Sequence, residues 1–250
     1  MARNFQQREL YYGSRKFLAA SDWARGLPSS HRVPAALGSM ARHPAALRVL
    51  VDIWRLPVTH LRVQQADANA WWFRNWFGPR RRLGWAVLDL PPAEDHYLVG
   101  RPKQALRTNL RHARTLGVTS SRVGYETWFD AASAVLRARD DKPGPEYAPP
   151  GPGQEAAFYV VRDGRGTALA YAGVALLKQL AVLFALVSRP DRQPEASWAR
   201  YQLHTFLAFD LGSSGVNHLL TGSALRESAG QQYFQHLLGY RPRNLRVEMI

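Results

Sequence analysis

Four cationic side chains recur at helical spacing near the middle of the chain, and their chemistry suits phosphate. They are Lys103, Arg107, Arg111 and Arg114. Intervals of four, four and three residues place all of them on one face of a helix, beside an apolar stripe formed by Leu106, Leu110 and Ala113. No carboxylate occurs between residues 101 and 117, and like charges on one face repel each other. We interpret this face as a phosphate-binding ridge; the alternative is a solvated basic face whose acidic partners lie elsewhere in the fold.

The first half of the chain carries nearly all of the net positive charge. Residues 1–125 hold 20 Lys and Arg against 7 Asp and Glu, whereas residues 126–250 hold 13 against 12. All but 4 of the 33 cationic residues are arginine, whose planar guanidinium binds phosphate through two hydrogen bonds. Genomic base composition would account for arginine in place of lysine but not for the asymmetry. We therefore expect a polyanionic partner, such as a nucleic acid, on one part of the molecule.

Aromatic residues and arginines cluster between residues 71 and 82. The cluster comprises Trp71, Trp72, Trp76, Arg80, Arg81 and Arg82. Aromatic rings stack on unpaired bases while arginines hold the backbone phosphates, so the three arginines are candidates for RNA binding. The aromatic residues are more typical of a core between two parts of a protein, and we favour that interpretation for them. A role at a membrane surface is a weaker alternative.

Composition excludes several kinds of site. The chain has no cysteine, so it has neither a disulfide nor a thiol nucleophile, and its 8 histidines are scattered without the spacing of metal ligands. The first residues lack the apolar stretch of a secretion signal, and no run approaches the roughly 18 apolar residues of a membrane span. We expect a cytoplasmic protein without a metal site and without stable membrane association.

The fold that positions these residues becomes regular only after residue 84. Residues 1–84 read as a basic, mostly helical region, and residues 85–250 as one α/β domain. Strands are predicted at 85–90, 118–125, 156–162, 168–177, 180–188, 216–222 and 243–250, and helices at 102–116, 126–139, 196–211 and 227–239. Gly117 and Gly239 are expected to end two helices, and Asp163-Gly164 to form a turn. This order predicts a mixed central sheet with helices on both faces.

The order of elements resembles the GNAT acyltransferase fold, in which one central strand splays from its neighbour and makes room for the acyl donor. Three segments resemble more closely the FemABX-like branch of that fold, whose donor is aminoacyl-tRNA. They are LRTNLRHARTLGV (106–118), ASWARYQLHTFLAFDLGSSGVNHLLTGS (196–223) and GQQYFQHLLGYRPRNLRV (230–247). The resemblance covers about residues 85–250 and rests on element order and short patterns.

The segment after the splayed strand departs from the acetyl-CoA-dependent enzymes of this fold. Those enzymes hold the pyrophosphate of CoA on a glycine-rich loop at a helix N-terminus, whereas the stretch SRPDRQPEASWARY here has no glycine. Pro190 and Pro194 remove two backbone donors, and Asp191 and Glu195 would repel an anion. The resemblance therefore implies aminoacyl-tRNA as the acyl donor with no further cofactor, and acetyl-CoA is the alternative.

The resemblance also implies where the chemistry takes place. Backbone N–H groups of the splayed strand, near Ala185–Ser188, would hold a developing oxyanion. Candidate groups for proton transfer are His204, Ser223 and Tyr233, with His218 as a further one. Glu146 and Tyr147 are expected to bind the acceptor, because they lie in the loop that would cover it. That proline- and glycine-rich loop is equally typical of a passive connector.

Charge, predicted fold and the missing pyrophosphate loop together favour one function. It is the transfer of an amino acid from aminoacyl-tRNA to the amine of a small peptide or natural-product intermediate, which forms an amide. The alternatives are an acyl-CoA-dependent N-acyltransferase and a non-catalytic RNA-binding module derived from the GNAT fold. The sequence leaves open the amino acid, the tRNA, the acceptor and the oligomeric state.

Overall fold

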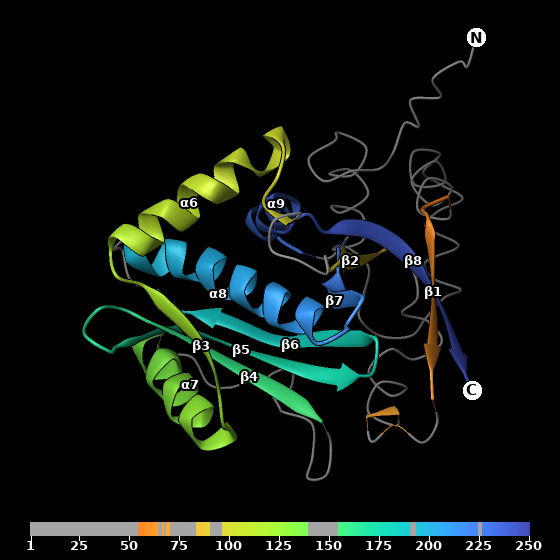
Figure 1. Cartoon of the computed structure of the whole chain (residues 1–250), viewed down its shortest axis with the longest axis horizontal. Helices are drawn as coiled ribbons and strands as arrows, with labels where there is room; N and C mark the ends of the chain where they lie inside the picture. Colours follow the sequence, from red (N-terminus) through yellow and green to blue (C-terminus); the bar gives the residue numbers. More distant parts are fainter. Residues whose placement is uncertain are drawn as a thin grey trace, which may run out of the picture. The chain divides into compact units, whose positions relative to one another are not determined.

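The computed structural model describes residues 55–64, 67, 69–70, 84–90, 97–139, 155–190, 194–224 and 227–250 (Figure 1). The described part of the chain is mixed α/β, with eight strands, and it divides into two compact units. We name the units after the strands β8 (Arg241–Met249) and β6 (Leu180–Ser188). Of the described residues, the β8 unit contains 55–62, 84–87 and 222–248, and the β6 unit contains the others. The domain boundary predicted at residue 84 stays a prediction.

The described residues of the β8 unit form three strands and one helix. Its strands follow the order β1 (Val58–Val63), β8, β2 (Trp85–Asp89), and β2 pairs antiparallel with β8. Helix α9 (Ala229–Leu238) begins after Ser228, whose hydroxyl accepts a hydrogen bond from the N–H of Gln231. It ends at Gly239, which has a left-handed φ of 95°, as the sequence predicts. Strand β1 was not predicted, although its residues alternate between exposed and buried.

The β6 unit is built on five strands in the order β7-β6-β5-β4-β3. The strands not yet defined are β3 (Thr119–Val123), β4 (Ala156–Arg162), β5 (Ala168–Leu177) and β7 (His218–Ser223, of which residues 218–221 belong to this unit). Strands β3 to β6 form an antiparallel meander, whereas β7 pairs in parallel with β6. The predicted mixed sheet is confirmed, and β4, β5 and β6 have the bounds of the three predicted apolar runs.

The turn between β4 and β5 is longer than an Asp-Gly pair. Oδ1 of Asp163 accepts hydrogen bonds from the N–H groups of Arg165, at 2.9 Å, and of Thr167, at 2.8 Å. Gly166, and not Gly164, takes the positive φ, of 82°. The side chain of Asp163 therefore organises the turn, and the residue that needs glycine lies two positions later than predicted.

Helices cover both faces of the β6-unit sheet. They are η1 (Arg101–Lys103), which leads into α6 (Gln104–Thr115), α7 (Tyr125–Arg139) and α8 (Pro194–Ser213). Val160 packs with α7, whereas its neighbour Tyr159 donates a hydrogen bond to Asp210 of α8. Successive residues of a strand point to opposite faces, so α7 and α8 lie on opposite faces, with α6 packed on α8 (Figure 1). The predicted arrangement of helices is confirmed.

The apolar stripe predicted on α6 is the face that this helix buries. Leu106, Leu110 and Ala113 are its buried residues. The helix closes at Gly117, whose φ of 68° is left-handed. The four predicted cations of this segment consequently lie outside the helix's buried stripe.

A β-bulge interrupts the register between β5 and β6. Gly173 lies opposite Ala185, but the next residue, Val174, lies opposite Leu183. Phe184 is therefore an additional residue on β6, and its ring lies over Gly173. A Cβ added at Gly173 would lie 2.5 Å from Cε2 of Phe184. This close approach requires glycine on β5.

We expect the substitution Gly173→Ala to lower the free energy of unfolding by about 2 kcal/mol, because the new methyl group must displace the ring of Phe184 from a packed site. Urea unfolding of the purified variant measures the change. Gly164→Ala is the matched control, since nothing lies within 4 Å of a Cβ added in the β4–β5 turn. Equal stability of the two variants would contradict the role assigned to the bulge.

Candidate functional site

Strands β6 and β7 part after a short stretch of parallel pairing. In the described residues this pairing joins Leu180–Val182 to His218–Leu220. β6 continues beyond it for six residues, to Ser188. The bulge at Phe184 lies just after the last pair, and bulges bend and twist the strand that carries them. The end of β6 is therefore a strand edge that has left its pairing with β7.

Backbone groups on this edge point away from β5. The N–H of Arg189 donates to the carbonyl oxygen of Leu169 at 2.8 Å, so it points toward β5. Successive N–H groups of a strand point to opposite sides, so the N–H of Ser188 points away from β5. It points to the side of β6 on which β7 pairs with Leu180–Val182. A donor in that position can bind a carbonyl oxygen or an oxyanion. This is the region, Ala185–Ser188, where the resemblance implies an oxyanion site.

Arg139 brings a positive charge to the same end of β6. It is the last residue of α7, its side chain is exposed, and its Nη1 donates to the carbonyl oxygen of Ser188 at 3.0 Å. The guanidinium thus lies beside the strand edge and favours negative charge there. Sequence reasoning missed Arg139, because a basic residue in the last turn of a helix is common and only the fold brings it to residue 188.

Lys103 lies at the start of α6, half-buried against an aromatic ring. Its Nζ is 4.3 Å from the ring centroid of Tyr97, which in turn meets Phe209 of α8 edge-on at 5.5 Å. Burial lowers the pKa of Lys103 to about 8. Lys103 is therefore turned toward the protein, where its ammonium group stabilises the packing of Tyr97, and its part in phosphate binding stays a prediction.

His204 is fully buried in α8 and interacts with that lysine. Burial, and secondly the positive charge of Lys103, lowers the pKa of His204 to about 3. The positive charge of Lys103 therefore acts on His204, and both are predicted site residues. The imidazole is neutral at pH 7, and protonating it in place would be costly. Its part in proton transfer stays a prediction.

The remaining ridge residues on α6 divide into two kinds. Nη1 of Arg107 donates to the carbonyl oxygens of Leu98, at 2.5 Å, and Gly100, at 2.9 Å, so this arginine holds the segment that leads into the helix. Arg111 and Arg114 present exposed side chains. The helix that carries them has no carboxylate, and phosphate binding by the ridge stays a prediction.

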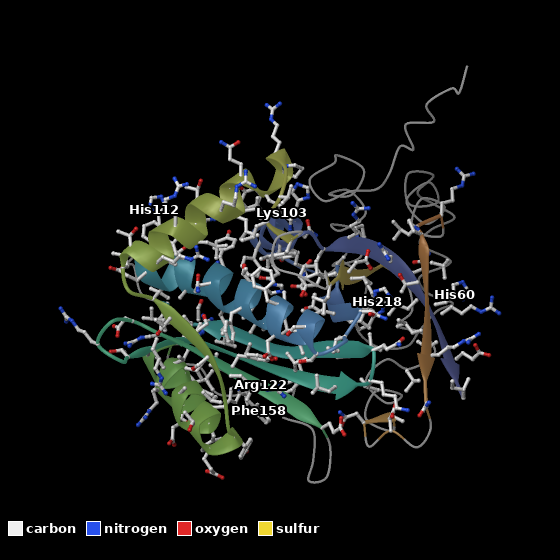
Figure 2. All side chains as sticks on the ribbon, in the orientation of Figure 1. His60, Lys103, His112, Arg122, Phe158 and His218 are labelled. Atoms are coloured by element: carbon white, nitrogen blue, oxygen red, sulfur yellow. The ribbon has the colours of Figure 1, made fainter. Side chains whose placement is uncertain are left out.

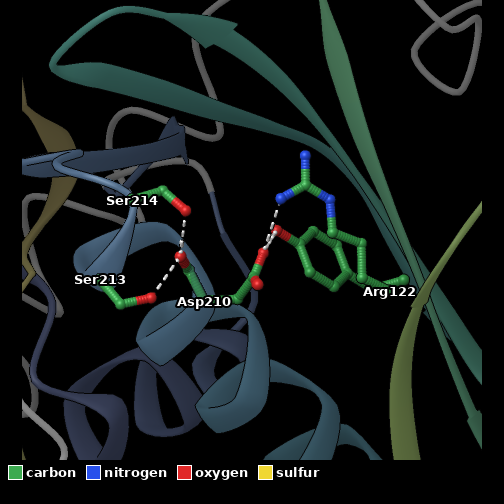
Figure 3. Close-up of polar contacts among 5 residues, drawn as sticks. Arg122, Asp210, Ser213 and Ser214 are labelled. Carbon is green, nitrogen blue, oxygen red and sulfur yellow. Dashed lines mark hydrogen bonds and ion pairs between the residues drawn. The ribbon is translucent and has the colours of Figure 1, made fainter.

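A polar cluster ties α8 to the far strands of the sheet (Figure 3). Oδ2 of Asp210 accepts from the hydroxyl of Tyr159 at 2.7 Å and from Nη1 of Arg122 at 3.1 Å. Burial, and then the bond to Asp210, raises the pKa of Tyr159. The hydroxyls of Ser213 and Ser214 donate to the main-chain oxygen of Asp210. This cluster connects β3, β4 and the end of α8, and we assign it a structural role.

His218 forms a second polar pair with Asp89. Nδ1 of His218 lies 3.0 Å from Oδ1 of Asp89, and such a carboxylate fixes the orientation of an imidazole. His218 is opposite Leu180, at the start of β6. At about 3.3 Å per residue, Leu180 is about 26 Å from Ser188 along the strand. His218 therefore cannot act on a group held at Ser188.

Ser223 and Tyr233 belong to the β8 unit, whereas His204 belongs to the β6 unit. Ser223 is the last residue of β7, and Tyr233 on α9 is 60% exposed. Their joint action with His204 stays a prediction. The other predicted site residues lie outside the described residues, as does the tryptophan cluster: Trp71, Trp72, Trp76, Arg80, Arg81, Arg82, Glu146 and Tyr147.

Glu227 is a candidate that sequence reasoning missed in the β8 unit. A Cβ added at Gly222 would lie 2.9 Å from its Oε1, so the carboxyl group rests against the end of β7. Burial raises the pKa of Glu227, and carboxyl groups with a perturbed pKa are frequent at functional sites. A single glutamate in a short connection has no distinctive pattern, so no signal in the sequence identifies it.

Comparison with known proteins found similarity in solved structures. No family model matches the chain, and a search of curated proteins found no match. The C-terminal DUF2156 domain of a protein described as a lysylphosphatidylglycerol synthetase, from Agrobacterium fabrum, is 18% identical with a TM-score of 0.45, over 64% of this chain and 58% of that one. The L-PGS from Bacillus licheniformis is 13% identical with a TM-score of 0.46, over 64% and 57%.

A GCN5-related N-acetyltransferase from Kribbella flavida is also similar. It is 15% identical with a TM-score of 0.36, over 64% of this chain and 54% of that one. The chain thus spans less than two thirds of the length of each of these three structures. The FemABX-like branch of the fold stays a prediction.

Two further findings concern the described residues alone. None of their helices is long and apolar enough to cross a membrane. Among the same residues, no three or more His, Asp or Glu side chains gather as a metal site would require.

We expect the substitution Lys103→Met to change how stability depends on pH. The pKa of Lys103 is about 8 in the folded protein and 10.5 in the unfolded chain, so between these values the unfolded state binds more protons and the free energy of unfolding rises with pH. Relative to K103M, the wild type should gain about 2 kcal/mol between pH 7 and about pH 9.5. Urea unfolding across this range measures the gain. Arg101→Met, at an exposed neighbour, should follow the wild type; parallel curves for K103M and the wild type would contradict the burial of Lys103.

Proposed function

We propose that this protein is an acyltransferase that moves an amino acid from aminoacyl-tRNA to the amine of a small peptide or natural-product intermediate. The observation that carries the proposal is the early end of pairing between β6 and β7. The N–H of Ser188 therefore points to the side of β6 on which the pairing with β7 has already ended. The guanidinium of Arg139 lies beside the carbonyl group of the same residue. Stabilising an oxyanion is the largest single need of acyl transfer.

The reaction requires little more than this donor and correct positioning. The amine nitrogen attacks the ester carbonyl carbon, and the carbonyl oxygen becomes an oxyanion held by backbone N–H groups. This attack forms the C–N bond. The oxyanion then collapses, which restores the carbonyl and breaks the C–O bond to the terminal ribose, and a proton of the amine passes to the ribose oxygen, which leaves as a hydroxyl. His204, Ser223 and Tyr233 are the proposed groups for that transfer, with Glu146 and Tyr147 binding the acceptor. No cofactor beyond the acyl donor is needed, because the ester is already activated.

Aminoacyl-tRNA is favoured over acyl-CoA by the first turn of α8 and by the charge of α6. Pro194 and Glu195 open α8, so this turn lacks one backbone donor and carries a negative charge where a pyrophosphate would bind. Arg111 and Arg114 offer exposed positive charge on a helix without carboxylates. Side chains rather than a helix N-terminus are therefore proposed to hold the phosphates, as RNA binding by arginines requires.

We expect the purified protein to bind tRNA with an affinity that falls about 100-fold between low and physiological salt, and to bind acetyl-CoA weakly or not at all. A filter-binding salt series with charged tRNA, uncharged tRNA and acetyl-CoA measures both. A mass-spectrometric screen with pooled charged tRNAs and an amine panel should then detect amide products. Tight binding of acetyl-CoA without tRNA binding would support the acyl-CoA alternative. Binding of tRNA with no transfer to any amine would support the non-catalytic module.

We expect Arg111→Glu combined with Arg114→Glu to abolish tRNA-dependent transfer and to lower the slope of log affinity against log salt by about 2, because two phosphate contacts are lost. The matched control is Arg137→Glu with Arg165→Glu, which changes the net charge equally at exposed positions on α7 and in the β4–β5 turn. Arg107 is left intact because it holds the segment before α6. Unchanged tRNA binding in the first double variant would show that the RNA does not lie on α6.

A further inference from the structure

A stack of two rings joins α6 to α8 on the side of the molecule where β6 ends. The imidazole of His112 lies on the indole of Trp198, with ring centroids 4.7 Å apart and 20° between the planes. Trp198 is half-buried, whereas His112 is exposed. The indole stacks on one face of the imidazole, and the histidine side chain is exposed to solvent.

The stack belongs to the same end of the β6 unit as the proposed oxyanion donor. β6 ends at Ser188, and α8 begins at Pro194, four residues before Trp198. The end of α6, the beginning of α8 and the end of β6 lie on one side in Figure 1, and Figure 2 shows His112 at that end of α6 with Lys103 at the other. The stack, the N–H of Ser188 and the guanidinium of Arg139 therefore lie toward one end of this unit.

His112 is also adjacent to the exposed part of the basic ridge. Consecutive residues of an α-helix are about 100° apart. With the buried stripe of α6 facing inward, Arg111 and His112 consequently lie on the two sides of the solvent-facing crest of the helix. A polynucleotide that crosses this crest can place a phosphate on Arg111 and an unpaired base on His112, the pairing of contacts used for single-stranded nucleic acids.

We propose that the His112–Trp198 stack binds the unpaired terminal nucleobase of the tRNA that donates the amino acid. The base extends the stack as its third ring, and the attached ribose then carries the acyl group toward the end of β6. This inference rests on the proposed function, because it assigns the donor's end a place in the same site. A base stacks on an aromatic ring without a hydrogen-bond code, so the contact is worth about 1–3 kcal/mol for any base.

Binding of intact tRNA and of tRNA lacking its terminal nucleotide tests the assignment. The wild type should bind the intact tRNA about tenfold more tightly than the shortened one. His112→Ala should bind both equally, and His112→Phe, which keeps a ring, should retain the difference. Arg111→Ala is the matched control on the neighbouring residue. It should weaken the binding of both tRNAs by the same factor and so preserve the ratio of their affinities. Thermal unfolding of each variant verifies that α6 remains folded.

The outcomes separate this inference from the function on which it rests. If the wild type binds tRNA but does not distinguish the two forms, or if H112A still distinguishes them, the base-binding role is overturned and the proposed function stands. If the wild type binds neither tRNA, the proposed function fails. If acetyl-CoA binds the wild type and loses affinity with H112A, the stack holds the adenine of a CoA donor and the RNA assignment is overturned.

Discussion

The contact between the ring of Phe184 and the backbone of Gly173 is the constraint on which the β6 unit depends. β6 must remain paired with β5 along its whole length and yet leave β7 after Val182. One extra residue achieves both, because a bulge keeps the ladder on one side while it bends the strand and increases its twist. The bulge falls next to the last residue paired with β7. The ring of the additional residue, Phe184, lies over β5, and only a residue without a Cβ at position 173 leaves room for it.

The two faces of the sheet hold this bent strand in place by different means. On one face Phe184 joins an aromatic cluster with Trp128 and Tyr171 under α7, where edge-to-face packing adds to the burial of apolar area. On the other face the carboxylate of Asp210 fixes α8 to Tyr159 and Arg122 by hydrogen bonds. The aromatic cluster includes Phe184 itself, whereas the polar cluster joins α8 to β3 and β4, so the bulge is held by packing.

Local patterns in the sequence were sufficient for most of the elements but not for the site. β4, β5 and β6 follow from apolar runs bounded by turn residues, and the buried face of α6 follows from its period. β1 was missed because its alternation follows a proline in a segment of irregular composition. The bond from Arg139 to Ser188 and the stack of His112 on Trp198 join residues 49 and 86 positions apart. Such contacts depend on tertiary packing, which no local pattern encodes. The burial of Lys103 against Tyr97 could not be predicted for the same reason.

The position of the positive charges also limits how a donor can be held. A helix N-terminus binds phosphate through backbone N–H groups, whose geometry is fixed and whose strength depends little on salt outside the pocket. Pro194 and Glu195 weaken that option at α8, so the proposed function assigns phosphate binding to the arginine side chains of α6. These side chains are exposed, and salt screens their attraction for phosphate within about 10 Å. They can therefore orient a polyanion but do not fix the position of a single phosphate group. Holding one end of the ligand in register then requires a contact of another kind, and an exposed ring beside those arginines supplies it without competing for the same phosphates.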